Sequence, residues 1–209
     1  MLRRVTGRQE PPVPTQRIGF VLAHPDDEAM FFVPTLKSLS LHHSFVLCLS
    51  SGNVDGLGET RKREMKKSCA ILGVPDEQLI ILDCPELRDG LDQVWDPQLV
   101  KSKVARFVEK FRITQLLTFD EYGVSGHPNH TAAFEGVRLF LRQDLTSVRG
   151  FKLCSPNLLR KYTGIIDLFI TLLIFLQRQK SGHLLFFTWN PFFSWKCMRA
   201  HRSQFVWYR

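Results

Sequence analysis

Two short clusters of histidines and carboxylates are the residues in this sequence best suited to chemistry. The first, AHPDDE at 23–28, brings one imidazole and three carboxylates close together, and the second, GHPNH at 126–130, contains two imidazoles. Two histidines and one carboxylate, with coordination positions left open, make up a catalytic zinc site. The same set also describes the facial triad of non-haem iron oxygenases. The residue types alone therefore indicate one metal ion and leave hydrolase and oxygenase both open.

Alternating strand and helix patterns must position these clusters. Apolar runs predict strands at 17–23, 44–50, 79–82, 115–119, 150–155 and 183–189. Apolar residues at helical spacing predict helices at 29–41, 59–72, 97–111, 130–142, 157–179 and 191–208. Apolar strands separated by helices are typical of a parallel sheet covered on both faces. We therefore predict an α/β fold, a Rossmann-like three-layer sandwich with a mostly parallel sheet, although the first strand lacks the GxGxxG dinucleotide fingerprint.

Both clusters fall at the edge of the sheet where such folds bind ligands, beyond the carboxyl ends of the strands. The first directly follows the strand at 17–23, and the second follows the strand at 115–119 after a short loop. Acids at the start of a helix also have a simpler role, because they cap free N–H groups and complement the helix dipole. Capping does not explain His24 together with a second histidine cluster at the same edge. The placement therefore favours a metal site.

Composition and charge narrow the class of protein. The chain has 209 residues, a net charge of +8 and 44% hydrophobic residues, which excludes disordered and low-complexity classes. Residues 1–16 are basic and proline-rich and predict a flexible tail, with one domain at 17–209. Five scattered cysteines favour reduced thiols, and no apolar run reaches the ~18–20 residues of a membrane span. The charge suits a phosphate-bearing or membrane partner, and without any recognisable nucleic-acid motif we expect no nucleic acid partner.

The two clusters, together with the segments GETRKRE, SPNLLRKY and HRSQ, resemble the de-N-acetylases of the LmbE-like family. Within that family the resemblance is strongest to the N-acetylglucosaminyl-phosphatidylinositol de-N-acetylases of glycosylphosphatidylinositol (GPI) anchor biosynthesis, and it runs from about Arg17 to the C-terminus. GETRKRE and HRSQ add weight to this subgroup rather than chemistry. The resemblance implies a zinc-dependent amide hydrolase that removes acetyl from N-acetylglucosaminyl-phosphatidylinositol, the second step of GPI-anchor biosynthesis.

The resemblance also implies a role for each residue of the motifs. Three residues would bind a divalent metal, with Zn²⁺ as the expected ion: His24, Asp27 and His130. Asp26 would be the general base that takes a proton from water, and His127 would stabilise the oxyanion or protonate the leaving amine. Glu28 would support the loop from behind the ligands. Arg61 would contact sugar hydroxyls or the phosphate, and the alternative for Arg61 is a surface ion pair with a nearby glutamate.

The implied lipid substrate places the protein at the cytosolic face of the endoplasmic reticulum membrane. Residues 1–16 are hydrophilic, so peripheral attachment or a cytoplasmic form is expected. We expect the apolar segments 165–176 and 184–195 to be a sheet-covering helix and the last core strand, with contact to a lipid surface as the alternative. Two other functions stay open: a cytosolic deacetylase of a soluble N-acetylglucosamine conjugate, and a non-catalytic, anchor-less paralogue.

Overall fold

A computed structural model describes residues 16–39, 43–143, 147–155, 160, 165–178 and 182–205. The predicted tail at 1–16 lies outside the described residues except for Gln16. The described chain forms a five-stranded sheet in the order β3-β2-β1-β4-β5, and every neighbouring pair is parallel. The strands are β1 (Arg17–Leu22), β2 (His43–Cys48), β3 (Leu79–Ile81), β4 (Gln115–Thr118) and β5 (Arg149–Lys152).

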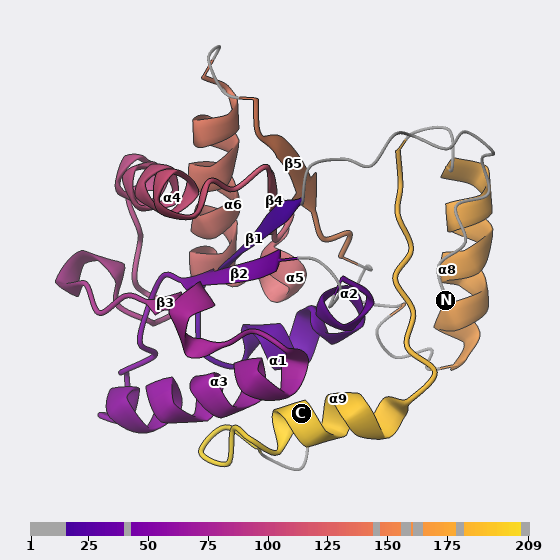
Figure 1. Cartoon of the computed structure of the whole chain (residues 1–209), viewed down its shortest axis with the longest axis horizontal. Helices are drawn as coiled ribbons and strands as arrows, with labels where there is room; N and C mark the ends of the chain where they lie inside the picture. The colour runs from indigo at the N-terminus through magenta and orange to yellow at the C-terminus, as the bar shows by residue number, and fades with distance from the viewer. Residues whose placement is uncertain are drawn as a thin grey trace.

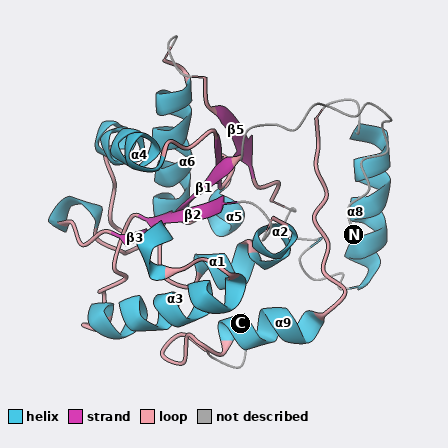
Figure 2. Cartoon of the chain, viewed as in Figure 1, coloured by secondary structure: helices cyan, strands magenta, loops and turns pink. Residues whose placement is uncertain are grey.

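Helices cover both faces of this sheet, which confirms the predicted three-layer α/β sandwich (Figures 1 and 2). One face carries α4 (Pro97–Phe111) and α6 (Pro128–Leu141). The other carries α1 (Asp27–Phe31), α2 (Val33–Ser38) and α3 (Gly58–Leu72), and α9 (Pro191–Met198) packs against all three of these helices. Shorter elements are η1 (Asp76–Gln78), η2 (Pro85–Leu87) and α5 (Gly123–Gly126).

The central strand β1 fixes where the first cluster lies. β1 and β4 are neighbours in the sheet, and Thr118 Oγ1 donates a hydrogen bond of 2.9 Å to the carbonyl of Val21 at their carboxyl ends. Gly19 of β1 lets α4 approach closely, because a Cβ there would lie 2.7 Å from Cε1 of the buried Phe107. Burying such a ring contributes roughly 1.5–3 kcal/mol. The loops that follow β1 and β4 therefore begin next to each other on a well-packed platform.

The ends of the helices follow local sequence signals. Helix α3 ends where Gly73 adopts a left-handed conformation with φ 84°, as the glycine predicts. The helix predicted at 29–41 is instead two short helices separated at Phe32. Pro34 explains the break, because proline has no N–H to donate and is accepted only in the first turn of a helix, where it lies in α2.

The C-terminal third differs most from expectation. Residues 182–190 are described without strand pairing, so the strand predicted at 183–189 is wrong. Helix α8 (Ile165–Arg178) forms within the predicted range 157–179, but it stands away from the sheet in Figure 1 and does not cover it. The helix predicted at 191–208 ends at Met198. Over the described part of the chain, every helix is too short or too polar to cross a bilayer.

Candidate active site

The loop after β1 and the start of α6 bring together the three residues predicted as metal ligands. Asp27 Oδ1 lies 3.3 Å from His130 Nε2, and Asp27 Oδ2 lies 4.0 Å from His24 Nδ1. All three side chains are at most 6% exposed. Asp27 Oδ2 also accepts the backbone N–H groups of Ala23 and His24, at 2.9 and 2.8 Å, which fixes its carboxylate at the head of α1.

Hydrogen bonds around the two imidazoles determine which nitrogens face Asp27. His24 Nε2 lies 3.0 Å from both Asp89 Oδ1 and Asn129 Oδ1, and since both are acceptors, Nε2 carries the proton. His130 Nδ1 lies 3.0 Å from the carbonyl of Gly123, so Nδ1 is the donor there. The remaining ring nitrogens, His24 Nδ1 and His130 Nε2, both face Asp27. Two imidazole nitrogens and a carboxylate in this arrangement suit a divalent metal of the zinc type.

Burial and neighbouring charges shift the pKa values of three residues in the cluster. Burial raises the pKa of Asp27, but His130 and His24 outweigh burial and lower that pKa to about 2. Burial lowers the pKa of His24, whereas Asp89 and Asp27 reverse the shift and leave the pKa raised. Burial and the neighbouring His24 and His130 together lower the pKa of His127 to about 4. At neutral pH, Asp27 is therefore ionised and His127 is neutral.

His127 lies close to the proposed metal ligands His24 and His130, and its hydrogen bonds indicate which role it has. The ligand atoms of His24, His127 and His130 lie within 4.8 Å of one another, so these three could also hold a metal ion. His127 Nδ1, however, accepts the backbone N–H of Asn129 at 3.3 Å. In the neutral imidazole this leaves Nε2 as a donor, which suits a hydrogen bond to substrate better than a metal bond.

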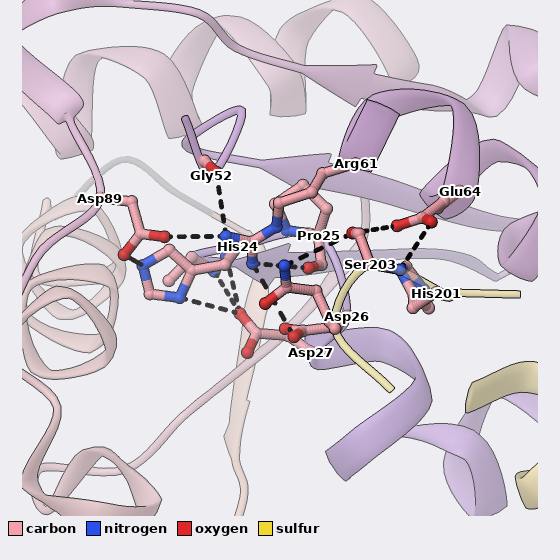
Figure 3. Close-up of polar contacts among 12 residues, drawn as sticks. His24, Pro25, Asp26, Asp27, Gly52, Arg61, Glu64, Asp89, His201 and Ser203 are labelled. Carbon is pink, nitrogen blue, oxygen red and sulfur yellow. Dashed lines mark hydrogen bonds and ion pairs between the residues drawn. The ribbon is translucent and has the colours of Figure 1, made fainter. Parts of the chain in front are cut away.

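The two adjacent carboxylates of the first cluster point to different partners (Figure 3). Asp27 faces the histidines, whereas Asp26 Oδ2 lies 3.8 Å from Nη2 of Arg61. Asp26 has a φ of 123°, a conformation that costs a non-glycine residue about 1–3 kcal/mol. The corner between β1 and α1 therefore separates the two side chains through a strained backbone.

Arg61, from the first turn of α3, supports this corner through hydrogen bonds to the backbone. Its Nη2 donates to the carbonyl of Pro25 at 3.0 Å, and its Nη1 donates to the carbonyl of Gly52 at 2.9 Å and to Asp89 Oδ2 at 3.1 Å (Figure 3). Only 7% of Arg61 is exposed. These contacts identify Arg61 as a support of the loop, and the contact with substrate implied by the sequence stays a prediction.

A buried ion pair joins the C-terminal region to the same corner. His201 Nε2 lies 2.5 Å from Glu28 Oε1, and Glu28 Oε2 accepts the backbone N–H of Asp26 at 3.2 Å. Burial lowers the pKa of His201, but the Glu28 carboxylate outweighs burial and raises it. Nearby, the N–H and the hydroxyl of Ser203 donate to the Glu64 carboxylate at 2.9 and 2.6 Å. The HRSQ segment thus braces the loop from behind, alongside Glu28.

Three residues of the site were not assigned from the sequence: Asp89, Asn129 and His201. Asn129 lies inside the GHPNH motif and His201 inside HRSQ, so membership of these motifs is a signal that the sequence contains. Asp89 follows η2 in a loop and belongs to no motif. Its contacts with His24 and Arg61 depend on tertiary structure alone.

A parallel sheet with helices on both faces, and a cluster of histidines and carboxylates beyond its central strands, defines a three-layer α/β protein with a candidate ligand site at the carboxyl ends of its strands. Its fold is shared by N,N'-diacetylchitobiose deacetylase from Pyrococcus horikoshii, with a TM-score of 0.59 and 19% identity over 91% of this chain and 71% of that one. The sequence model described as "PIG-L: GlcNAc-PI de-N-acetylase" matches residues 20–141, more than half of the chain. The chain belongs to this family.

Full-length relatives agree with that membership. The chain is 37% identical over 202 residues to the probable N-acetylglucosaminyl-phosphatidylinositol de-N-acetylase of Schizosaccharomyces pombe, covering 93% of this chain and 80% of the relative. It is 38% identical over 203 residues to the N-acetylglucosaminyl-phosphatidylinositol de-N-acetylase of Bos taurus, covering 92% and 76%. The similarity therefore extends beyond the region matched by the family model.

Proposed function

We propose that this protein is a metal-dependent hydrolase that removes the acetyl group from N-acetylglucosaminyl-phosphatidylinositol. The observation that carries the proposal is the convergence of His24 Nδ1 and His130 Nε2 on the ionised Asp27. The similarity to relatives named for this reaction supports the choice of substrate. A lipid-linked substrate also supports a location at the endoplasmic reticulum membrane, on its cytosolic face.

His24, Asp27 and His130 are proposed to hold one divalent cation, with Zn²⁺ as the expected ion. When bound, such an ion lowers the pKa of water to about 7 and polarises an amide carbonyl. The residues suit this task because Asp89 and Asn129 orient His24, and the Gly123 carbonyl orients His130.

The residues that complete the reaction are proposed to be Asp26 and His127. Asp26 is the general base. It is adjacent in sequence to the proposed ligand Asp27, but its carboxylate points toward Arg61 and not toward the histidines, so it is not used as a ligand. His127 is neutral and holds its proton on Nε2, so it donates a hydrogen bond to the carbonyl oxygen as negative charge develops there. Arg61 holds the carbonyl of Pro25 and is proposed to contact the substrate as well, and Glu28 keeps the backbone of Asp26 in place.

Metal analysis combined with an acetate-release assay tests the proposal. Purified protein should contain about one divalent ion per chain, release acetate from N-acetylglucosaminyl-phosphatidylinositol, and lose activity with a chelator until metal is restored. Equal turnover of a soluble N-acetylglucosaminyl-inositol would favour a deacetylase of soluble conjugates. Full metal occupancy without turnover of either substrate would contradict the assignment as an enzyme.

A further inference from the structure

Helix α8 places its apolar side chains toward solvent. Six of them are 45–63% exposed: Ile166, Leu168, Phe169, Leu172, Leu173 and Leu176. Spacings of three and four residues along an α-helix keep side chains on one side. The stripe through Ile166, Phe169, Leu173 and Leu176 is therefore one continuous apolar face. In Figure 1 the helix stands at the margin of the molecule, away from the sheet.

Two polar side chains of α8, those of Asp167 and Thr171, are engaged within the protein instead. Arg160 Nε donates to Asp167 Oδ1 at 2.6 Å, and Arg160 Nη2 donates to Thr171 Oγ1 at 2.6 Å. Thr171 Oγ1 also donates to Asp167 Oδ2 at 3.3 Å. A surface helix of a globular protein normally shows the opposite arrangement, with its apolar stripe toward the core. The orientation of α8 therefore calls for an apolar partner on its outer side.

The exposed apolar character continues beyond α8 into the extended segment and α9. Five more large side chains in this region are 41–84% exposed: Leu184, Phe187, Trp189, Phe192 and Trp195. We call these five residues and the six of α8 the C-terminal apolar surface. Monomeric soluble proteins rarely expose large apolar patches of this kind unless the patch binds something.

The positive charge of the C-terminal region favours a partner with a negatively charged surface. From Leu168 to Arg209 the sequence has no Asp or Glu and contains six Lys and Arg residues. Each basic residue near an anionic bilayer surface adds to binding, and exposed tryptophans favour the interface between lipid and water. A face that is apolar, aromatic and basic, on helices that do not span a bilayer, matches an interfacial membrane-binding surface.

We propose that the C-terminal apolar surface docks this protein on a bilayer that contains anionic lipid. The proposal rests on the proposed function in one respect, because it explains how the site reaches a lipid-linked substrate. Helix α9, which carries part of the surface, packs against α1, the helix that begins with Asp27. Docking through this surface therefore brings a bilayer close to the helix that supports the active site.

A matched pair of variants tests the docking surface. Leu173 and Val54 are each 60% exposed, but only Leu173 belongs to the C-terminal apolar surface. Sedimentation with phosphatidylcholine vesicles containing phosphatidylserine should show binding of the wild type and of Val54→Asp. Leu173→Asp should bind about 10- to 100-fold more weakly, because the insertion of one leucine is lost. Raising the salt concentration should weaken wild-type binding.

Activity separates this proposal from the proposed function. Leu173→Asp should release acetate from a soluble headgroup analogue as the wild type does, and should lose turnover of substrate embedded in vesicles. Equal vesicle binding by wild type and Leu173→Asp would overturn docking, even if acetate release were normal. A dimer that Leu173→Asp converts to a monomer, with vesicle binding unchanged, would assign the surface to a second copy instead. Normal vesicle binding without acetate release would contradict the proposed function alone.

Discussion

His201 and Glu28 form an ion pair with 2.5 Å between Nε2 and Oε1, and neither side chain is exposed to solvent. The two residues are 173 positions apart in the sequence. Because Glu28 also accepts the backbone N–H of Asp26, the pair connects the end of the chain to the strained corner that carries the proposed general base.

Replacing His201 should destabilise the protein in a pH-dependent way. His201→Gln leaves a buried carboxylate without its cationic partner, a loss on the order of 3–5 kcal/mol. The pKa of His201 is raised in the folded protein, so the pair stabilises fully below the ordinary histidine pKa, and this contribution is lost as pH rises through the raised value. Urea unfolding at several pH values should show the difference between wild type and His201→Gln shrinking from pH 6 to pH 9. The same loss at every pH would contradict this ionic role, and His183→Gln is the control.

Variants of Asp26 and of His130 should have different effects on turnover and on metal binding. Asp26→Asn keeps the shape of the side chain but removes the base, so turnover should fall by about 10²–10⁴-fold while the metal is retained. His130→Ala removes a proposed ligand and should abolish metal binding together with activity. Elemental analysis and acetate release on the same preparations measure both properties. Near-normal turnover by Asp26→Asn would remove Asp26 from the mechanism.

Asp89 should matter for metal affinity although it is not a proposed ligand. Its carboxylate fixes the tautomer of His24 by accepting from Nε2 at 3.0 Å. Asp89→Ala should therefore weaken metal binding about 10- to 100-fold, as measured by competition with a chelator of known affinity. The exposed Asp92→Ala, in the same loop, provides the control. An unchanged affinity in Asp89→Ala would show that Asn129 alone orients His24.

Arg61 should not tolerate exchange for lysine. A single ammonium group cannot reach the carbonyls of Pro25 and Gly52 in the geometry of a guanidinium, so Arg61→Lys should leave a buried carbonyl unpaired at a cost of about 1–3 kcal/mol. Thermal unfolding and kcat/KM should both decline. Arg63→Lys, on the exposed side of the same helix, should behave as the wild type. If Arg61→Lys kept its stability and raised only KM, direct contact with substrate would be the better account.

The sequence was sufficient for the part of the fold that follows local rules. Apolar runs and helical spacing predicted β1 to β5 and the two covering layers, because burial on both faces imposes those patterns on the chain. The motifs also predicted which residues meet, since the carboxyl ends of neighbouring parallel strands share one edge. Their roles as ligands and catalysts stay predictions.

The rest of the fold and of the site depends on contacts between residues far apart in the sequence, which local sequence patterns do not predict. The run at 183–189 has the composition of a strand but does not pair with β5, at the edge of the described sheet. Helix α8 has a clear apolar stripe, yet a stripe does not say whether it faces a core or something outside the chain. Asp89 reaches His24 only because its loop crosses the strand ends after folding.

The distance along the chain between Glu28 and His201 also has a consequence for biosynthesis. Glu28 leaves the ribosome 173 codons before His201, a delay of roughly 9–35 s at ordinary translation rates. Until His201 is made, Glu28 cannot form this ion pair. Completion of that corner therefore waits for the synthesis of His201, and a premature stop codon between positions 153 and 201 would yield a product that contains all five described strands but lacks the histidine partner of Glu28.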